Sequence, residues 1–345
     1  MYFISILLII MNRLIDCIIH KKSSGIPVWF MRQAGRYLPE FQEIRKKNPN
    51  FIKLCLNSNL VKDITIQPLK RFDLDAAIIF SDILMIPYGL GQEVEFKKGY
   101  GPELGDPSPD KILGTSSKDF IKKITPVYNG IKQVKKEIKE KNLIGFVGAP
   151  WTLLVYMLNK QSPKKNFSFD KINKDKSLIN KLLKKIETTT CLHVEKQIEA
   201  GANIIQIFDS WAGLLPEQEL QNYCYAPTLK IVDHIKSLNV PVICFPKGIG
   251  KNYIDFNSTV KPDCISIDYE VDPKWIKEKL KGTPIQGGLD PKILLTDKDN
   301  IKRNTENYIK IFSDYPYVFN LGHGVLPETK PETIEYLIQI IRKKI

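Results

Sequence analysis

The chain has 345 residues, 43% of them hydrophobic and 26% charged, a composition that predicts a globular protein with a sizeable core in one large domain or two. Lysine and arginine outnumber aspartate and glutamate by 51 to 38, which gives a formal net charge of +13. This charge does not predict nucleic-acid binding, because the lysines fall in helix-like runs with interspersed glutamates, without zinc-finger spacing, an aromatic RNA-binding motif or an arginine-rich arm.

The first eleven residues, MYFISILLIIM, are apolar enough to suggest a secretory signal peptide. They lack a basic region in front of the apolar run, however, and no small-residue cleavage site follows them. The run is also too short to cross a bilayer. We therefore expect neither a secretory signal nor a membrane partner.

Two arginines four residues apart, Arg32 and Arg36, stand in the segment PVWFMRQAGRYLPE at residues 27–40. Arginine stays charged and offers a planar fork of donors that fits a carboxylate, so such a pair suits a polyanionic ligand. Gly35, between them, allows the backbone to approach that ligand closely. The alternative is a surface turn with two solvated arginines, since basic pairs are common and usually structural.

Short apolar runs rich in β-branched residues alternate with longer amphipathic segments along the rest of the chain. One such segment, residues 178–201, has helical periodicity and ends at Gly201, which is typical of a helix stop. Alternating strands and helices predict parallel βα units, and seven clear runs favour a (β/α)8 barrel over an open doubly wound sheet. No run is assigned to the eighth strand. The seven runs cover residues 76–80, 143–148, 203–208, 240–245, 264–268, 283–288 and 317–322.

Polar side chains follow most of these runs, at the end of the strands where barrels of this kind carry their chemistry. They are Asp82, the segment 150–156 that ends in Tyr156, Asp209, Ser210, Lys247, Asp290 and His323. Aspartate and serine are also favoured helix N-caps, so a single one of them does not indicate a site. Several on one face together predict a binding site.

The sequence carries no recognisable metal or nucleotide motif. The glycines of residues 89–101 lack the spacing of a phosphate-binding loop, and we expect this segment to form a hairpin at the rim. Cys191 and His193 are two residues apart, which directs them to different sides of a helix, so we expect structural roles for both. Six cysteines without a CxxC pair indicate buried thiols in a reducing compartment.

Seven motifs, in order along the chain, resemble those of the uroporphyrinogen decarboxylase family, beginning with the segment 27–40. The other six are FDLDAAIIFSDIL (72–84), GFVGAPWTLLVYM (145–157), QIFDSWAG (206–213), CFPKG (244–248), QGGLDP (286–291) and NLGHGVLP (320–327). The resemblance implies a single-domain (β/α)8 TIM-type barrel over residues 11–345, with the active site at the C-terminal ends of the strands, in a cytoplasmic homodimer. Because Met11 stands where such proteins usually begin, we expect residues 1–10 to come from an upstream start codon.

The resemblance also implies an activity, the cofactor-independent decarboxylation of the four acetate side chains of uroporphyrinogen III to methyl groups. The products are coproporphyrinogen III and carbon dioxide, in haem biosynthesis. Decarboxylation needs an electron sink, which most enzymes obtain from a cofactor. Here a pyrrole of the substrate, once protonated beside its acetate arm, accepts the electrons that are released as carbon dioxide leaves. We therefore expect no metal and no other cofactor.

The family match implies roles for individual residues, with Asp82 and Arg32 as the expected catalytic residues. Asp82 would lie at the centre of the macrocycle, accept hydrogen bonds from pyrrole N–H groups and stabilise the cation as it forms. The proton donor stays open, because arginine is a poor general acid, Asp82 is expected to be an anion and His323 matches a substrate contact only. The positions that match substrate-binding residues are Arg32, Gln33, Ala34, Gly35, Arg36, Asp82, Tyr156, Ser210 and His323.

Two other functions remain as alternatives. A corrinoid-linked methyltransferase is similar in fold and outline, but such enzymes bind zinc through His and Cys, and no His-x-Cys occurs in this chain. A non-catalytic porphyrin-binding protein is the second alternative. It is distinguished from the enzyme by whether Asp82 and both arginines are needed for turnover.

Overall fold

A computed structural model of the chain describes residues 12–22, 25–97, 101–163, 167–172 and 174–343. The expected extension at residues 1–10 lies outside these residues.

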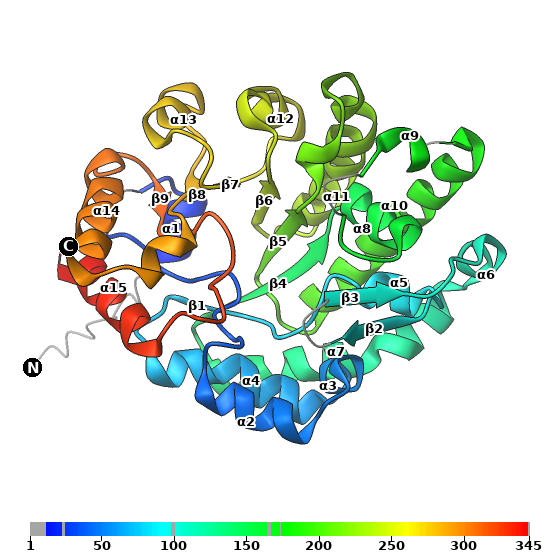
Figure 1. Cartoon of the computed structure of the whole chain (residues 1–345), viewed down its shortest axis with the longest axis horizontal. Helices are drawn as coiled ribbons and strands as arrows, with labels where there is room; N and C mark the ends of the chain where they lie inside the picture. The colour runs from blue at the N-terminus through cyan, green and yellow to red at the C-terminus, as the bar shows by residue number, and fades with distance from the viewer. Residues whose placement is uncertain (1–11, 23–24, 98–100, 164–166, 173, 344–345) are drawn as a thin grey trace, which may run out of the picture.

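Seven parallel strands form one curled sheet in the described part of the chain (Figure 1). In the order of the sheet, which is also their order in the chain, they are β1 (Ala76–Ile78), β4 (Asn142–Gly148), β5 (Ile204–Asp209), β6 (Val242–Pro246), β7 (Cys264–Ile267), β8 (Ile285–Gly287) and β9 (Tyr317–Val318). Each strand overlaps one of the seven predicted runs, so the prediction of alternating strands and helices with parallel pairing is confirmed.

Helices lie around the outside of the curled sheet (Figure 1). The helices before the first strand, between strands or after the last one include α4 (Ser58–Arg71), α7 (Ser117–Ile138), α10 (Lys176–Glu199), α11 (Ala226–Ser237), α12 (Tyr253–Val260), α13 (Pro273–Lys279), α14 (Lys298–Ile311) and α15 (Pro331–Lys343). The other helices are α1 (Arg13–Ile18), α2 (Pro39–Lys47), α3 (Phe51–Cys55), α5 (Met85–Gly89), α6 (Pro109–Gly114), α8 (Pro150–Asn159) and α9 (Phe169–Ile172). Single turns are η1 (Ala212–Leu214), η2 (Glu217–Glu219), η3 (Gln221–Tyr225), η4 (Gly250–Asn252) and η5 (Pro291–Leu295).

Helix α10 illustrates how local sequence sets the ends of an element. The Asp175 side chain accepts a hydrogen bond from the Leu178 backbone N–H at 3.0 Å and so caps the first turn. Gly201, two residues beyond the helix, adopts φ +117°, a conformation that favours glycine. The predicted helix at residues 178–201 is therefore confirmed to within two residues at each end.

A hairpin is present apart from the main sheet, as predicted, but it extends to residue 104, beyond the predicted segment 89–101. Strand β2 (Val94–Lys97) pairs antiparallel with β3 (Gly101–Leu104). The residues between the two strands lie outside the described part of the chain.

Alternate residues of the strands divide the core into two clusters, one on each face of the sheet. In β1, Ala76 and Ile78 belong to the smaller cluster, while Ala77 between them packs with the larger cluster beneath the outer helices. The smaller cluster also contains Leu14, Cys17 and Ile18 of α1, so this helix packs against the inner face of the curled sheet. Both clusters draw residues from widely separated parts of the chain.

Polar side chains on the inner face form a buried network. The Trp29 indole N–H donates to Gln286 Oε1 at 2.9 Å. Gln286 Nε2 lies 3.2 Å from both Gln206 Oε1 and Ser266 Oγ. Gln206, Ser266 and Gln286 come from β5, β7 and β8, so this network ties three strands to the segment that carries Trp29. Buried polar groups bonded to one another in this way fix the register of a core.

The segment around Val28 lies between the two edge strands of the sheet. Pro27 O accepts from the Phe319 backbone N–H at 2.8 Å, and the Trp29 N–H donates to Phe319 O at 3.4 Å, beside β9. On the other side, the Asp75 N–H donates to Val28 O at 2.9 Å, immediately before β1. The segment thus bonds to both edges, with one parallel bridge to Phe319 and no regular strand of its own.

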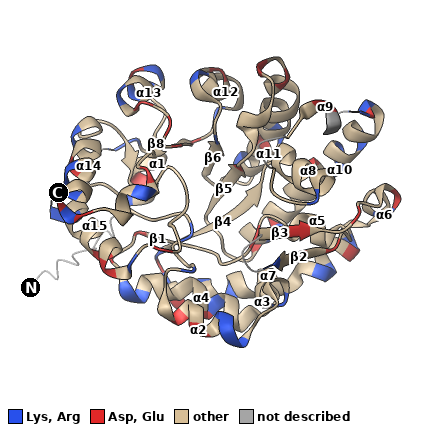
Figure 2. Cartoon of the chain, viewed as in Figure 1, with Lys and Arg blue, Asp and Glu red and all other residues tan. Residues whose placement is uncertain are grey.

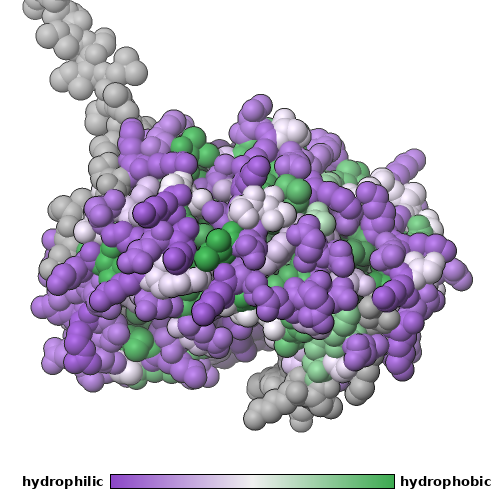
Figure 3. Space-filling model, turned by 90° about the horizontal axis from the view of Figure 1, so that it is seen from above, coloured by the Kyte–Doolittle hydropathy of each residue, from purple (hydrophilic) through white to green (hydrophobic). Residues whose placement is uncertain are grey.

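Lysine and arginine are spread over the outer helices, interspersed with acidic residues (Figure 2). The face of the molecule in Figure 3 is mainly hydrophilic, with small, separate hydrophobic areas. Among the described residues, no helix has the length and hydrophobicity needed to cross a bilayer. The basic charge therefore lies mainly on solvated helix faces, as the lysine runs predict.

Candidate active site

The two arginines of the sequence motif lie on a tight turn directly after the segment that joins β9 and β1. Arg32 adopts φ +62°, in the left-handed region that side chains other than glycine rarely enter. A Cβ on Gly35 would lie 2.6 Å from Arg32 O, so only glycine permits this close approach. Strain of this kind, roughly 1 kcal/mol or more at Arg32, persists where the surroundings fix the chain and is frequent at functional sites.

Gln33 holds this turn against the sheet. Its side chain is completely buried, Oε1 accepts from the Phe30 N–H at 3.0 Å, and Nε2 donates to Ala76 O of β1 at 3.0 Å. Ala34 is half-buried and packs against the larger core cluster. The Gln33 side chain is thus engaged within the protein, and a ligand could meet this residue only through its main chain.

The turn is also fixed to the loop after β9. The Met31 N–H donates to Asn320 Oδ1 at 3.1 Å, and Met31 O accepts from the Val325 N–H at 2.9 Å. A Cβ on Gly324 would lie 2.4 Å from Arg32 Cδ and 2.7 Å from Cγ, so the arginine side chain runs directly over this glycine. Arg32 is therefore aimed by the loop that carries His323.

Asp82 lies just after β1 and is half-buried. Its Oδ1 accepts from the Leu84 N–H at 2.8 Å, which fixes the orientation of the carboxyl group. Desolvation by the surrounding protein raises the pKa of Asp82 to about 6, against the smaller opposing effects of the Leu84 hydrogen bond and the Arg32 charge. Above that pH the group is mainly an anion, held with few compensating contacts.

Electrostatic interactions join Arg32 to three other predicted site residues. Desolvation by the surrounding protein lowers the pKa of Arg32, although the residue keeps an exposed surface, and the charge of Arg36 acts in the same direction, while Asp82 and Tyr156 act in the opposite direction. Neither guanidinium forms a hydrogen bond or an ion pair with any residue that the structure describes, and both side chains remain exposed. Two unpaired cations beside one carboxylate leave a net positive site, suited to a ligand with several negative charges.

Tyr156 and Ser210 are positioned by contacts between α8 and the loop after β5. Thr152 Oγ1 donates to Asp209 Oδ1 at 2.6 Å and accepts from the Trp211 N–H at 3.0 Å, so the residues on either side of Ser210 are both anchored. The rings of Tyr156 and Trp211 lie 5.9 Å apart. Burial raises the pKa of Tyr156, so its phenol is neutral and able to donate a hydrogen bond.

His323 faces the same region from the loop after β9. Burial, together with the positive charges of Arg32 and Lys247, lowers the pKa of His323 to about 4. The imidazole is therefore neutral near pH 7 and offers one donor and one acceptor. The interaction with Lys247 comes from the end of β6, three strands away in the sheet.

The polar residues at the other strand ends have mainly structural partners. Asp290 accepts from the Lys292 N–H at 2.9 Å and caps η5, so the capping interpretation of this residue is correct. Asp209 is buried beneath Ser210, and desolvation raises its pKa to about 6. Sequence reasoning noted Lys247 at a strand end but left it out of the substrate-binding set.

A metal site is not evident in the described part of the chain, where no group of three or more His, Cys, Asp or Glu side chains could hold an ion. His193 is buried, and its Nδ1 lies 3.0 Å from the hydroxyl of Tyr128. Burial lowers the pKa of His193 to about 3, which agrees with the structural role expected for it.

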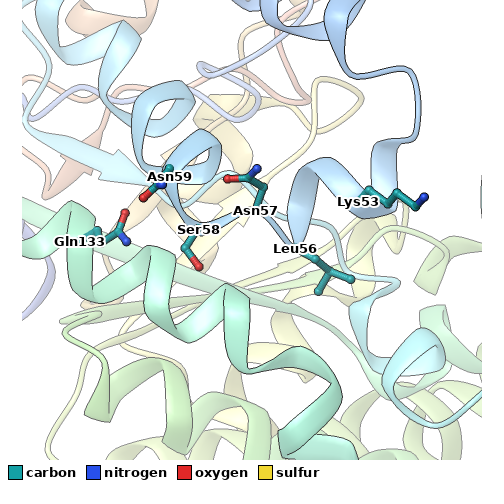
Figure 4. Close-up of a pocket in the computed structure, with 6 residues that line it drawn as sticks. All are labelled: Lys53, Leu56, Asn57, Ser58, Asn59 and Gln133. Atoms are coloured by element: carbon teal, nitrogen blue, oxygen red, sulfur yellow. The ribbon is translucent and has the colours of Figure 1, made fainter.

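An open depression on the outer layer does not belong to this site. It is lined by Lys53, Leu56, Asn57, Ser58, Asn59 and Gln133, around the start of α4 and the facing side of α7 (Figure 4). Asn57 caps α4 through the Leu60 N–H, and Ser58 Oγ donates to Pro126 O. These side chains serve the packing of α4 on α7, and none of the predicted site residues lines the depression.

Comparison with known proteins identifies the family of the chain. The family profile described as Uroporphyrinogen decarboxylase (URO-D) matches residues 11–344. A relative named uroporphyrinogen decarboxylase from Rickettsia bellii is 43% identical over 338 residues, which is 96% of this chain and 98% of the relative. One of the same name from Cereibacter sphaeroides is 38% identical over 326 residues, covering 92% and 95%.

Among solved structures, a methyltransferase from Methanosarcina mazei matches 96% of this chain and 98% of its own, with a TM-score of 0.78. Its sequence identity of 17% limits the likeness to the fold. The corrinoid-linked methyltransferase alternative thus shares a fold with this chain, while the family match and the named relatives point to decarboxylation.

Proposed function

Because the chain belongs to the uroporphyrinogen decarboxylase family and decarboxylates uroporphyrinogen in porphyrin biosynthesis, we propose that the reaction takes place at the carboxyl ends of the strands around Asp82. In each step a pyrrole carbon beside an acetate arm takes up a proton. The bond to the carboxylate then breaks, its electrons neutralise the ring cation, and carbon dioxide leaves. A second proton then adds to the exocyclic methylene carbon and completes the methyl group, and the ring carbon releases the first proton, which restores the aromatic pyrrole.

Asp82 stabilises this cation as its charge develops. A carboxylate held by the Leu84 N–H and surrounded by protein needs little reorganisation when the positive charge appears, which is the condition for strong electrostatic stabilisation. The pKa of about 6 keeps Asp82 mainly ionised at neutral pH. The same value allows it to exchange a proton more readily than an ordinary aspartate, so the carboxyl group is chemically able to take part in proton transfer.

Arg32 and Arg36 bind acetate and propionate arms of the substrate, while Tyr156, Ser210 and His323 add hydrogen bonds. This assignment is supported by the unpaired guanidinium groups of these two exposed residues and by the neutral states of the phenol and the imidazole. Gln33, Ala34 and Gly35 contribute through the shape and the main chain of the turn, because the Gln33 side chain is bonded inside the protein.

The finer architecture belongs to the same proposal. We take residues 11–345 as one domain, and the segment at Val28 as the eighth member of a closed (β/α)8 barrel. Its bonds to Phe319 on one side and Asp75 on the other support closure. The cytoplasmic location and the homodimer rest on the family resemblance. The family resemblance is likewise the basis for expecting uroporphyrinogen III and four acetate decarboxylations.

The observation that carries the assignment of roles is the interaction of Asp82 with Arg32 in a site of net positive charge. Its test is the Asp82→Asn variant, assayed anaerobically with uroporphyrinogen III. Asparagine can keep the hydrogen bond to Leu84, so we expect substrate binding within a few-fold of the wild type and kcat lower by roughly two orders of magnitude or more.

The matched control is Asp290→Asn, the same chemical change at another strand end, where the side chain caps η5. It should retain nearly normal turnover. Near-normal turnover of Asp82→Asn would remove Asp82 from the mechanism.

A further inference from the structure

We propose that Lys247 is an additional substrate-binding residue, which holds a carboxylate of the macrocycle on the side of the site opposite Arg32 and Arg36. The inference rests on the proposed function and adds a second anchoring point to it.

The order of the strands places Lys247 on the side of the site opposite the arginine turn. It directly follows β6. Counting along the bonded neighbours, β6 is four places from the segment at Val28 through β7, β8 and β9, and four places through β5, β4 and β1. The end of β6 therefore lies diametrically opposite the segment that leads into the arginine turn.

The backbone around Lys247 is firmly held. The Lys247 N–H donates to Asp209 O at 3.1 Å, and Lys247 O accepts from the Gly213 N–H at 2.9 Å. The next residue, Gly248, adopts φ +81° and donates its N–H to Asp268 Oδ2 at 2.7 Å. Because the backbone is held in place, only the side chain of Lys247 has to be ordered on ligand binding, which reduces the conformational entropy lost.

The ammonium group of Lys247 has no partner within the described protein. The side chain is half-buried and forms neither a hydrogen bond nor an ion pair with any described residue. The nearby carboxylates have other donors, since Asp268 is bonded to Gly248, Tyr253 and Glu270, and Asp209 to Thr152. A lysine with a purely structural role at this place would be expected to form an ion pair with Asp268 or Asp209, and Lys247 forms neither.

The side chain reaches toward the middle of the site. Its charge acts on His323, which belongs to the loop after β9 and contacts the Arg32 turn through Gly324. For residues three strands apart to interact, Lys247 must extend inward over the end of the sheet rather than outward to the helices. A ligand with eight carboxylates that is bound by arginines on one side offers further carboxylates on the other.

The test compares Lys247→Met with Lys251→Met, which removes the same charge from an exposed lysine four residues further on, in η4. The loss of one charge-assisted contact to a carboxylate should raise the KM for uroporphyrinogen III about tenfold to a hundredfold, with a smaller change in kcat. Lys251→Met should leave both constants unchanged. Lys247→Arg should restore most of the affinity, and Lys247→Gln replaces the methionine variant if that variant fails to fold.

A second measurement does not depend on turnover. The stable oxidised macrocycle uroporphyrin III is titrated into each protein and its binding is followed by fluorescence, with the same rise in Kd expected for Lys247→Met. KM and Kd values within twofold of those of Lys251→Met would overturn the role of Lys247. Absence of decarboxylation by the wild type would instead contradict the proposed function, while the binding titration would still decide whether Lys247 holds carboxylates.

Discussion

Arg32 shows how one residue can satisfy two interpretations of a sequence. The motif allowed either a carboxylate clamp or a surface turn with solvated arginines, and the structure has a turn in which both arginines are exposed residues. What separates it from an ordinary turn is its construction. Arg32 is held at a positive φ, and Gly35 and Gly324 leave room for its carbonyl and its side chain. Such strain is retained where a side chain must point in one direction.

Desolvation of Asp82 affects both the stability of the fold and the proposed chemistry. Its carboxyl group keeps one hydrogen bond, to the Leu84 N–H, and its pKa is raised to about 6 mainly by desolvation. A desolvated anion destabilises the folded protein. The same desolvation lets the carboxylate stabilise a cation strongly, so stability is lost where function gains.

The Asp82→Asn variant should therefore be more stable than the wild type at pH 8. An unfolded aspartate titrates near 3.9, so between that pH and about 6 the folded wild type holds its proton more tightly, and its stability falls as the pH rises through this window. Asparagine does not ionise, so the variant does not lose stability in this way as the pH rises. We expect a gain on the order of 2 kcal/mol at pH 8 that shrinks toward pH 4.5.

Equilibrium unfolding in urea at the two pH values measures this difference. A variant that is equally or less stable than the wild type at pH 8 would mean that Asp82 is not desolvated in the folded protein.

At the level of elements, the loop after β9 and the arginine turn form one unit. Met31 is bonded to Asn320 and Val325, and Gly324 lies under the Arg32 side chain. Neither contact follows from the sequence, because the two motifs are almost 300 residues apart. The sequence did place both among the site motifs, and the bonds between them explain why a tight turn and a glycine-rich loop occur together.

Gly324→Ala should disturb this unit without unfolding the protein. The added Cβ would overlap Arg32 Cδ and Cγ, which belong to a flexible side chain, so the arginine can move away at little cost to the fold. It would then leave its place beside Asp82. We expect a loss of roughly tenfold or more in kcat/KM with a nearly unchanged melting temperature.

The control for this change is Gly114→Ala, where an added Cβ meets nothing within 4 Å. The steady-state kinetics of the two variants are compared under identical anaerobic conditions. Equal kcat/KM values would show that the position of Arg32 does not depend on Gly324.

The seven strands of the sheet were predicted well, whereas no run was assigned to an eighth strand, for a physical reason. Buried parallel strands read as β-branched runs, and all seven such runs overlap strands of the sheet. The segment at Val28 makes only one bridge and three main-chain hydrogen bonds to its two neighbours, beginning at a proline. A pairing this short needs no long β-branched run, so the sequence shows none that could be recognised as a strand. The apolar residues of this segment also lie next to the arginine motif, which was interpreted as a binding segment.

For the whole molecule, composition and motif order led to the family, and the structure added how the site is held together. The inner polar network of Trp29, Gln206, Ser266 and Gln286 had a weak signal, a polar residue in the middle of three apolar runs. No sequence signal indicated the structural role of Gln33. Its motif position indicated a ligand contact, but its side chain bonds to Phe30 and Ala76. Sequence patterns place residues near a site but do not say which atoms are already bonded.

The most direct measurement is the anaerobic incubation of the full chain with uroporphyrinogen III, followed by oxidation and chromatographic separation of the porphyrins. The proposed function predicts species with seven, six and five carboxylates in succession and the accumulation of the four-carboxylate product. A well-folded protein that leaves the eight-carboxylate porphyrin unchanged would contradict it.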